Sequence, residues 1–270
     1  MILKKGDIVG RNSYNSDILF KIDKILETNK GKIALLKGLM IRIEADAPIE
    51  DLKAVNKDTV RKNIKKFENI IINKIDNLKK ENRFDYIKVT TGKILHLDGD
   101  KKYSETAKIY YKKMGLNAIV KNIPEYKQTK MIRELIKKYN PDILVITGHD
   151  AMIKKGTRYN DINNYRNSKY FINSVIEARK IVPKEKDLVI FAGACQSFFE
   201  AIMEAGANFA SSPARVLIDF VDPLIVAEKV ATTEENKFIS MREITNELED
   251  EMKRVGGKGA RGKMKLNFSM

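Results

Sequence analysis

Apolar residues recur in short runs over the first fifty positions of the chain. Four runs rich in apolar and β-branched residues are separated by turns that carry Asn, Ser and Gly, a pattern typical of short β-strands. Several short strands within ~50 residues predict a small SH3-like β-barrel, which Ala45–Pro48 brings to an end. The predicted strands are Gly6–Gly10, Asp17–Ile22, Lys32–Gly38 and Met40–Glu44.

Residues 51–83 have a different period. Apolar side chains from Val55 to Leu78 fall near helical spacing among many lysines and arginines. This pattern predicts an amphipathic basic helix that links the barrel to the rest of the chain. A charged face of this kind usually faces solvent on a packed helix, although it also suits an anionic surface.

From residue 84 to about residue 250 the pattern alternates between strands and helices. Continuous apolar strands separated by helices predict an α/β fold with a mostly parallel sheet and helices on both faces. Right-handed crossovers place the strand-to-helix loops at the carboxyl edge, where open α/β sheets hold their active sites. Strands are predicted at Ile94–Leu97, Ala118–Val120, Asp142–Thr147, Asp187–Phe191 and Asn208–Ala210, with helices near 104–114, 131–136, 171–181 and 198–203.

The last segment, residues 251–270, changes character again. Arg254–Lys263 is rich in glycine and in charged residues. Such a composition buries little apolar surface, so this segment is predicted to be a flexible basic tail.

Composition narrows the chemistry that the chain is able to perform. The 270 residues include one Cys and two His, and the formal net charge is +15. A single Cys excludes an intramolecular disulfide framework, and one Cys with two His excludes a Cys-rich zinc site. The N-terminus lacks the apolar core of a signal peptide, and no apolar run approaches the ~18 residues of a membrane span. We expect a soluble protein, made inside the cell and without a membrane partner, whose positive charge attracts acidic partners.

Two predicted strands end in the same way, with a glycine and then a reactive side chain. Gly148 precedes His149 after one strand, and Gly193 shortly precedes Cys195 after another. If the strands are neighbours, ~4.8 Å apart, both side chains emerge at the carboxyl edge and face the same substrate atom. An imidazole and the N-terminus of a helix starting near Gln196 would both favour the thiolate. This pair therefore predicts a thiol nucleophile with an imidazole base.

Each of these residues also has a plainer interpretation. A lone Cys at a strand end is often a small buried hydrophobe, and a lone His is often structural. Their pairing at glycine-flanked strand ends favours catalysis by His149 and Cys195. His96 lies inside an apolar strand rather than at its end, and we interpret it as a core histidine or as one that contacts the site residues from within the core.

The residues around this pair resemble known peptidases. Thr147–Ala151 followed by Phe191–Ala201 resembles the His-then-Cys order of caspase-like cysteine peptidases, a group that includes clostripain, gingipain, legumain and separase. With Ala210–Val216, Lys5–Val9 and Leu95–Asp100, these segments are more specifically similar to the YabG family of sporulation-specific peptidases. The resemblance covers nearly the whole chain.

The resemblance implies both a fold and a function. It implies a caspase-like sheet and a cysteine endopeptidase that cleaves spore-coat and germination-related precursor proteins after arginine. His149 matches the general base and Cys195 the nucleophile, and no metal or organic cofactor is implied. The expected location is the mother-cell cytoplasm, at the forming spore coat.

The residue after the expected base departs from the caspase-like pattern. Those enzymes usually place Gly directly after the His, whereas Asp150 follows here. The backbone N–H groups of Asp150 and Cys195, with Gly148 as the hinge of the turn, are therefore the candidate oxyanion donors.

Two acidic residues are candidates for the pocket that receives the substrate arginine. In caspase-like folds the first strand of the sheet ends beside this pocket, and Asp98 and Asp100 stand at that position. A carboxylate pairs bidentately with a guanidinium, which Lys does not reproduce. The same residues equally suit a helix-capping turn, so both interpretations stay open.

Two other functions remain as alternatives. A glutamine-amidotransferase-like thiol enzyme carries its His after its Cys, whereas both histidines precede Cys195. A basic charge and a small barrel suit a nucleic-acid-binding protein, but no RRM, KH or helix-turn-helix signature is present, so we expect no specific nucleic-acid partner. In the peptidase interpretation, the positive charge retains the enzyme on acidic coat surfaces. The oligomeric state does not follow from the sequence.

Self-cleavage is predicted at Arg61, Arg83, Arg254 and Arg261.

Overall fold

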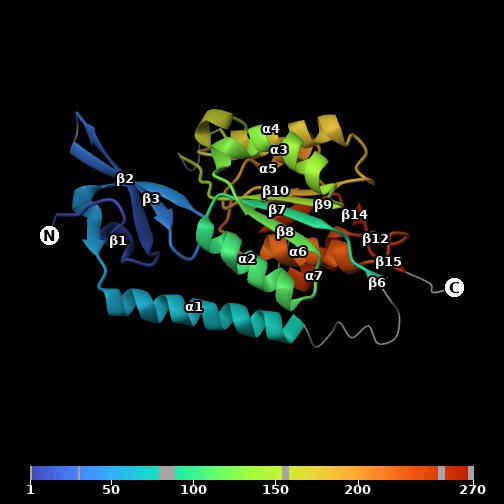
Figure 1. Ribbon diagram of the computed structural model, residues 1–270. Helices are drawn as coiled ribbons and strands as arrows, with labels where there is room; N and C mark the ends of the chain where they lie inside the picture. Colours follow the sequence, from blue (N-terminus) through green and yellow to red (C-terminus); the bar gives the residue numbers. More distant parts are fainter. Residues whose placement is uncertain (1, 30, 79–88, 154–157, 249–252, 267–270) are drawn as a thin grey trace.

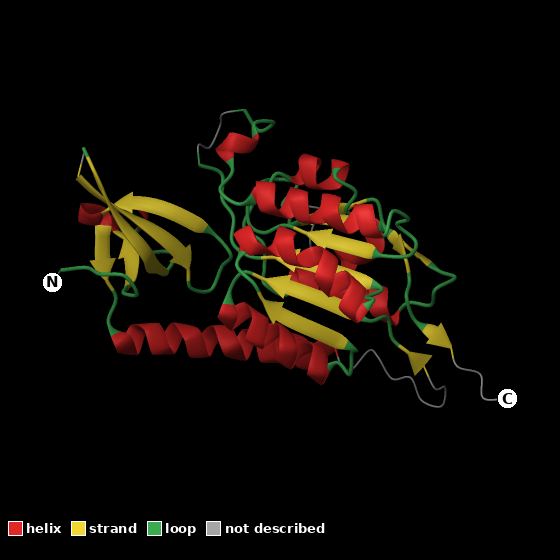
Figure 2. Cartoon of the chain, turned by 45° about the horizontal axis from the view of Figure 1, so that its top comes forward, coloured by secondary structure: helices red, strands yellow, loops and turns green. Residues whose placement is uncertain are grey.

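The computed structural model has two folded parts joined by a long helix (Figure 1). It describes residues 2–29, 31–78, 89–153, 158–248 and 253–266. An antiparallel sheet lies at the N-terminal end, and a larger α/β part carries helices on both faces of its sheet (Figures 1 and 2). Among the described helices, none combines the length and the apolar character needed to cross a membrane.

The N-terminal part is a five-stranded antiparallel sheet in the order β4-β3-β2-β1-β5. Its core includes Val9, Ile22 and Leu36, all buried. The predicted closed barrel is not confirmed, because among the described strands the edge strands β4 and β5 do not pair with each other. A single turn (η2) separates them, and β5 continues alongside β1 instead. The elements are β1 (Ile8–Arg11), η1 (Asn12–Tyr14), β2 (Phe20–Thr28), β3 (Gly31–Gly38), β4 (Glu44–Pro48), η2 (Ile49–Asp51) and β5 (Leu52–Ala54).

The loop before β4 departs from the prediction. Most of Met40–Glu44, predicted as a strand, forms a bend, and β4 begins only at Glu44. The Gly38 N–H donates to the Ile43 carbonyl at 2.8 Å and closes this bend. The strand-like pattern therefore has another cause, because Arg42 in the middle of the bend is fully buried against the α/β part.

Helix α1 (Lys57–Leu78) lies where a basic amphipathic helix is predicted. Its Phe67 packs on Phe220 of the α/β part, with ring centroids 5.7 Å apart. The helix thus contacts the domain that follows it through an apolar residue, while basic residues of the same turns face solvent. These exposed residues are Arg61, Lys62, Lys65 and Lys66.

The central sheet has six strands in the order β13-β11-β10-β9-β7-β8. All neighbours pair in parallel except β13, which runs antiparallel at one edge. Every residue of the four inner strands is buried, as expected where helices cover both faces. The predicted α/β architecture with a mostly parallel sheet is confirmed. The strands are β7 (Ile94–Asp98), β8 (Ala118–Asn122), β9 (Ile143–Thr147), β10 (Val189–Ala192), β11 (Phe209–Ser211) and β13 (Val255–Gly257).

Alternate residues of the inner strands enter two separate cores. Val145 and Phe191 pack with α2, α6 and α7 on one face, whereas Leu144 and Ile190 pack with α3, α4 and α5 on the other (Figure 1). The period of two that defines a strand thus decides which helix each residue contacts. The helices are α2 (Lys101–Lys113), α3 (Glu125–Tyr139), η3 (Ile162–Asn164), α4 (Ser168–Ile181), α5 (Phe199–Glu204), α6 (Asp222–Thr232) and α7 (Met241–Leu248).

The glycine-rich segment near the C-terminus is folded, so the prediction of a flexible tail is wrong. Strand β13 pairs with β11 and buries Val255 completely. A Cβ at Gly257 would lie 2.3 Å from the Asn208 carbonyl oxygen, and a Cβ at Gly256 would lie 2.7 Å from the Phe199 ring. These glycines permit close backbone approach, a role that composition does not distinguish from flexibility. Two short antiparallel pairs complete this region: β12 (Phe238–Ile239) with β14 (Ala260–Arg261), and β15 (Lys265–Leu266) with β6 (Val89–Thr90).

Candidate active site

The two reactive side chains, His149 and Cys195, follow neighbouring strands at matching positions. Strands β9 and β10 pair in parallel with Ile146 opposite Ala192. His149 and Cys195 each come three residues after these partners, and both are fully buried. The strand order thus brings the predicted pair to one edge of the sheet, as its place at two glycine-flanked strand ends requires.

The turn that carries Cys195 is fixed by its own backbone geometry. Gly193 and Gln196 adopt positive φ angles of 111° and 56°, which glycine tolerates readily and glutamine only under constraint. The Ser197 hydroxyl accepts a hydrogen bond from the Ala194 N–H and donates to an Asp150 carboxylate oxygen, both at 2.9 Å. The loops after β9 and β10 are therefore tied to each other beside the thiol.

The environment of the thiol differs from the prediction in two respects. Helix α5 begins at Phe199 rather than near Gln196, so the helix predicted to start directly after Cys195 begins later in the chain. Burial raises the pKa of the Cys195 thiol to about 12, although the Ile218 N–H approaches Sγ at 3.3 Å. In this closed arrangement the thiol is protonated, and thiolate formation requires the site to open or a base to take the proton.

His149 is positioned by a carboxylate that sequence reasoning missed. The His149 N–H donates to Glu125 Oε1 at 2.7 Å, and Nδ1 lies 3.9 Å from the same oxygen. Both ring nitrogens lack a hydrogen-bond partner within the described part of the chain. Burial raises the pKa of Glu125, and the nearby imidazole partly offsets that effect. A ring that is held but not hydrogen-bonded retains its capacity to accept and deliver a proton.

Two glycines make room for this carboxylate. A Cβ at Gly99 would lie 2.1 Å, and one at Gly148 2.3 Å, from Glu125 Oε1. The glycine before His149 therefore serves close packing against Glu125, and no positive φ is recorded for it. Glu125 is the first residue of α3, where a carboxylate normally reads as a helix-start residue. Its sequence signal therefore does not distinguish it from an ordinary cap.

The backbone and the carboxylate of Asp150, a candidate oxyanion donor, have different partners. Its N–H points to the Arg42 carbonyl oxygen at 3.3 Å. Its buried carboxylate accepts hydrogen bonds from Ser168, Ser197 and the Asn167 N–H. Burial raises the pKa of Asp150 to about 7 despite these bonds. Within the described residues, the Cys195 N–H has no acceptor, so it remains open to a substrate.

The two acidic residues after β7 have different surroundings. Asp100 accepts hydrogen bonds from the Lys102 and Tyr103 N–H groups and caps α2, as the helix-capping interpretation expects. Asp98 is fully buried and binds Arg42 Nη2 at 2.7 Å. Burial opposes ionisation of Asp98, but the Arg42 guanidinium and further hydrogen bonds outweigh it and hold its pKa well below its usual range.

Arg42 and Tyr103 complete the site and were not singled out from the sequence. The Arg42 guanidinium lies over the Tyr103 ring at 4.9 Å, and that ring lies 5.9 Å from the His149 ring. Arg42 Nε and Nη1 have no partner among the described residues. A lone arginine in the apolar run from Met40 to Ile43 was the available signal, because an isolated charge in such a run marks a paired, buried position.

His96 is buried in the core and contacts the site through Asp98, with Nε2 3.7 Å from Asp98 Oδ2. Its ring nitrogens contact the Tyr111 hydroxyl at 3.0 Å and the Thr147 hydroxyl at 2.9 Å. Burial lowers the pKa of His96, so it is neutral within the core. This placement agrees with both parts of the interpretation, because His96 is buried in the core and also contacts the site residue Asp98.

The chain is similar to a known protein family over nearly its whole length. The family description "YabG peptidase U57" matches residues 4–269. The chain belongs to this family. It is 40% identical over 280 residues to the sporulation-specific protease YabG of Bacillus subtilis (strain 168), covering 97% of each protein. No solved structure matches the chain. Membership in the YabG peptidase family supports a sporulation-associated peptidase and agrees with the resemblance seen in the motifs.

Proposed function

We propose that this peptidase is a cysteine endopeptidase that cuts after arginine, with Cys195 as nucleophile and His149 as general base and acid. The observation that carries the proposal is the arrangement of the carboxyl edge. Cys195 and His149 follow adjacent strands at matching register, and a buried carboxylate, Asp98, already holds a guanidinium beside them. Nucleophile, base and a cation-binding pocket thus share one edge of the sheet.

The chemistry follows from these positions. His149 takes the thiol proton as Cys195 Sγ attacks the main-chain carbonyl carbon of the substrate arginine. The tetrahedral oxyanion is stabilised by the Asp150 and Cys195 N–H groups. His149 then protonates the departing amine, and water hydrolyses the thioester. Glu125 holds the imidazole loop through the His149 N–H and favours the imidazolium that forms.

Specificity for arginine rests on Asp98. Its carboxylate is held by the Asp100 N–H at 2.8 Å and the Thr147 hydroxyl at 2.9 Å. The guanidinium that Asp98 now binds, that of Arg42, lies over the Tyr103 ring. A fixed, buried carboxylate with an aromatic face nearby suits a planar guanidinium better than a lysine ammonium. Asp100 supports this pocket indirectly, by capping α2 and by its backbone N–H.

Spore-coat and germination-related precursor proteins are the proposed substrates, and the forming coat in the mother cell is the proposed location. The similarity to the sporulation-specific protease of Bacillus subtilis, over 97% of the chain, supports the link to sporulation in this proposal. The net charge of +15 and the exposed basic face of α1 suit retention on acidic protein surfaces.

Hydrolysis of matched peptides tests the proposal. Peptides that differ only by Arg or Lys at one position are incubated with the wild type and with Cys195→Ala and His149→Ala. The wild type is expected to cut after Arg and to prefer it over Lys, and both variants are expected to lose cleavage. Cleavage retained by Cys195→Ala at the wild-type rate would overturn the assignment of the nucleophile.

A further inference from the structure

A segment of the N-terminal part lies in the active site. The bend from Leu39 to Ile43 leaves β3 and enters the carboxyl edge of the central sheet, where Arg42 is fully buried. Arginine is rarely buried to this extent unless it is paired. Its partner is Asp98 at 2.7 Å, the residue proposed above to bind the substrate arginine.

The main chain of this segment is held at the same place. The Arg42 carbonyl oxygen accepts from the Asp150 N–H at 3.3 Å, and the Glu44 N–H donates to the Asp150 carbonyl at 3.2 Å. Ile43 therefore pairs in parallel with Asp150. The carbonyl at the proposed oxyanion donor belongs to the residue whose side chain fills the arginine pocket, which is the register that a bound substrate needs.

The nucleophile and the base border the same residue. Burial raises the pKa of the Cys195 thiol, whereas the Ile218 backbone and the charge and backbone of Arg42 lower it. The Tyr103 ring under the Arg42 guanidinium lies 5.9 Å from the His149 ring. Pocket, oxyanion donor, nucleophile and base thus surround one arginine of the chain itself.

We propose that the Arg42–Ile43 peptide bond is a self-cleavage site, cut by Cys195 of the same chain. The proposal rests on the cysteine-peptidase function proposed above. Cys195 Sγ bonds to the Arg42 carbonyl carbon, the bond from that carbon to the Ile43 nitrogen breaks, and His149 delivers the thiol proton to the new amine. Water then hydrolyses the thioester, which leaves an Arg42 carboxylate and restores the thiol.

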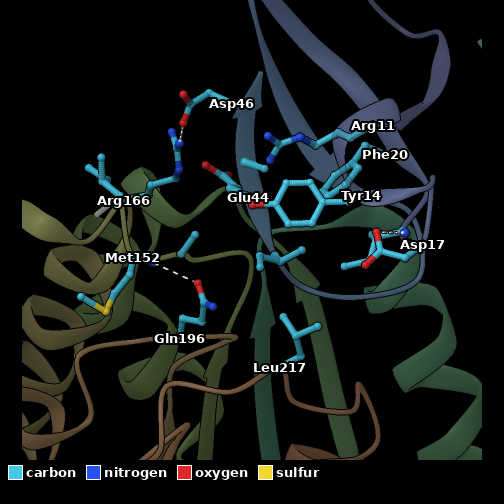
Figure 3. Close-up of a pocket in the computed structure, with 15 residues that line it drawn as sticks. Arg11, Tyr14, Asp17, Phe20, Glu44, Asp46, Met152, Arg166, Gln196 and Leu217 are labelled. Atoms are coloured by element: carbon cyan, nitrogen blue, oxygen red, sulfur yellow. Dashed lines mark hydrogen bonds and ion pairs between the residues drawn. The ribbon is translucent and has the colours of Figure 1, made fainter. Parts of the chain in front are cut away.

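The surroundings of the new amine suit this cut. A cavity of about 400 Å³ lies between the two folded parts, with Ile43–Asp46 on one side and Met152, Gln196 and Leu217 on the other (Figure 3). After the cut, Leu39–Arg42 is no longer joined to β4 and is able to leave the pocket. The rest of the fragment stays attached, because β3 pairs with β4 over five residue pairs and β1 pairs with β5.

Analysis of the full-length chain tests the proposal. Wild type, Cys195→Ala, Arg42→Gln and the control Arg133→Gln are purified and examined by intact mass and N-terminal sequencing, and each is assayed on an Arg peptide. Arg133 is an exposed residue of α3, so its substitution removes the same charge outside the site. Wild type and Arg133→Gln are expected to yield a fragment that begins Ile43-Glu44-Ala45, while Cys195→Ala stays intact. Arg42→Gln is expected to lower the rate of this cut at least about a hundredfold.

The outcomes separate the two proposals. A wild-type chain that hydrolyses the Arg peptide yet keeps the Arg42–Ile43 bond overturns self-cleavage and leaves the peptidase function standing. A chain that does neither overturns both. If Arg42→Gln does not fold, the N-terminal sequence of the wild-type fragment decides alone, because a fragment that begins anywhere other than Ile43 contradicts the proposed bond.

Discussion

Two segments at opposite ends of the chain carry arginines, and the structure treats them differently. The bend from Leu39 to Ile43 places Arg42 in the active site, with its guanidinium on Asp98 and its carbonyl at the Asp150 N–H. The glycine-rich segment near the C-terminus forms strand pairs on the edge of the molecule. The first segment is presented to the catalytic groups, and the second is withheld from them by its own hydrogen bonds.

Under the proposed function, this contrast predicts which of its own arginines the chain cuts. A flexible tail was predicted to expose Arg254 and Arg261. Arg254 instead bonds the Leu248 carbonyl at 2.6 Å, and Arg261 lies in a strand pair with Phe238. Arg83, also predicted, lies outside the described residues. We therefore expect access to the pocket and the register of the carbonyl to decide self-cleavage, rather than a charged, glycine-rich composition.

The largest expected effects are the loss of peptide cleavage without Cys195 and the selection of Arg42 among the chain's own arginines. Cys195→Ala is expected to lower kcat/KM for an Arg peptide by at least about 10⁴-fold, because nucleophile loss removes the covalent route. A peptide map of the aged wild type under native conditions should show the cut after Arg42 and none after Arg254 or Arg261. Cuts after Arg254 or Arg261 as rapid as the cut after Arg42 would break the comparison.

The next effect concerns pH, because the carboxyl group of Asp150 titrates near neutral pH. The backbone of this residue contacts Arg42 and Glu44 of the N-terminal part. The pKa of Asp150 is raised to about 7 from an ordinary value of 3.8, so the folded state binds the proton more tightly than the unfolded state. Between pH 4 and pH 7 this group makes the free energy of unfolding fall as pH rises, by on the order of 4 kcal/mol.

Asp150→Asn removes this slope. Urea unfolding of Cys195→Ala with and without Asp150→Asn, from pH 4 to pH 8, measures it without self-cleavage. The single variant should lose stability relative to the double variant as pH rises to 7, and the difference should level off above it. Parallel curves over this range would show that Asp150 has no raised pKa.

A third effect separates the two neighbouring carboxylates. Asp98→Asn should lower kcat/KM for an Arg peptide roughly 100-fold, because the guanidinium loses its buried charged partner. Asp100→Ala should instead lower the free energy of unfolding by about 1 kcal/mol through loss of the α2 cap. Kinetics on Arg and Lys peptides, with urea unfolding of both variants, distinguish them. Equal losses of Arg cleavage in both variants would contradict this division.

The smallest effect concerns the C-terminal strand. Gly257→Ala should lower the free energy of unfolding by about 1–3 kcal/mol, because its Cβ would meet the Asn208 carbonyl oxygen at 2.3 Å. Lys258→Ala, at a half-exposed side chain next to it, is the control and should change stability little. A neutral Gly257→Ala would indicate that this strand does not pack as described.

The features predicted from the sequence are those set by local pattern. Continuous apolar runs identify β9 and β10, and the residues just past them, His149 and Cys195, follow directly. Arg42 leaves a local signal of burial, an isolated charge in an apolar run, but no signal of its partner. The roles of Arg42 and Glu125 each depend on a contact far along the chain, Arg42 with Asp98 and Glu125 with His149.

The errors have equally physical causes. An apolar run around Arg42 indicates burial but not the direction of the chain, so a bend was predicted as a strand. Glycines in the C-terminal segment serve close approach of two strands, which leaves the same sequence signal as flexibility. Whether Asp98 and Asp100 line a pocket or cap a helix depends on where each carboxylate points. The sequence of a short turn does not determine that direction.

Labelling of the thiol tests the central claim most directly. The self-processed wild type is incubated with a peptidyl-arginyl chloromethyl ketone, which alkylates a nucleophile beside an occupied arginine pocket, and the adduct is located by peptide mass mapping. The account predicts one adduct on Cys195, loss of Arg-peptide hydrolysis in step with labelling, and slower labelling by the lysyl analogue. Full peptidase activity in protein whose Cys195 is alkylated would contradict it.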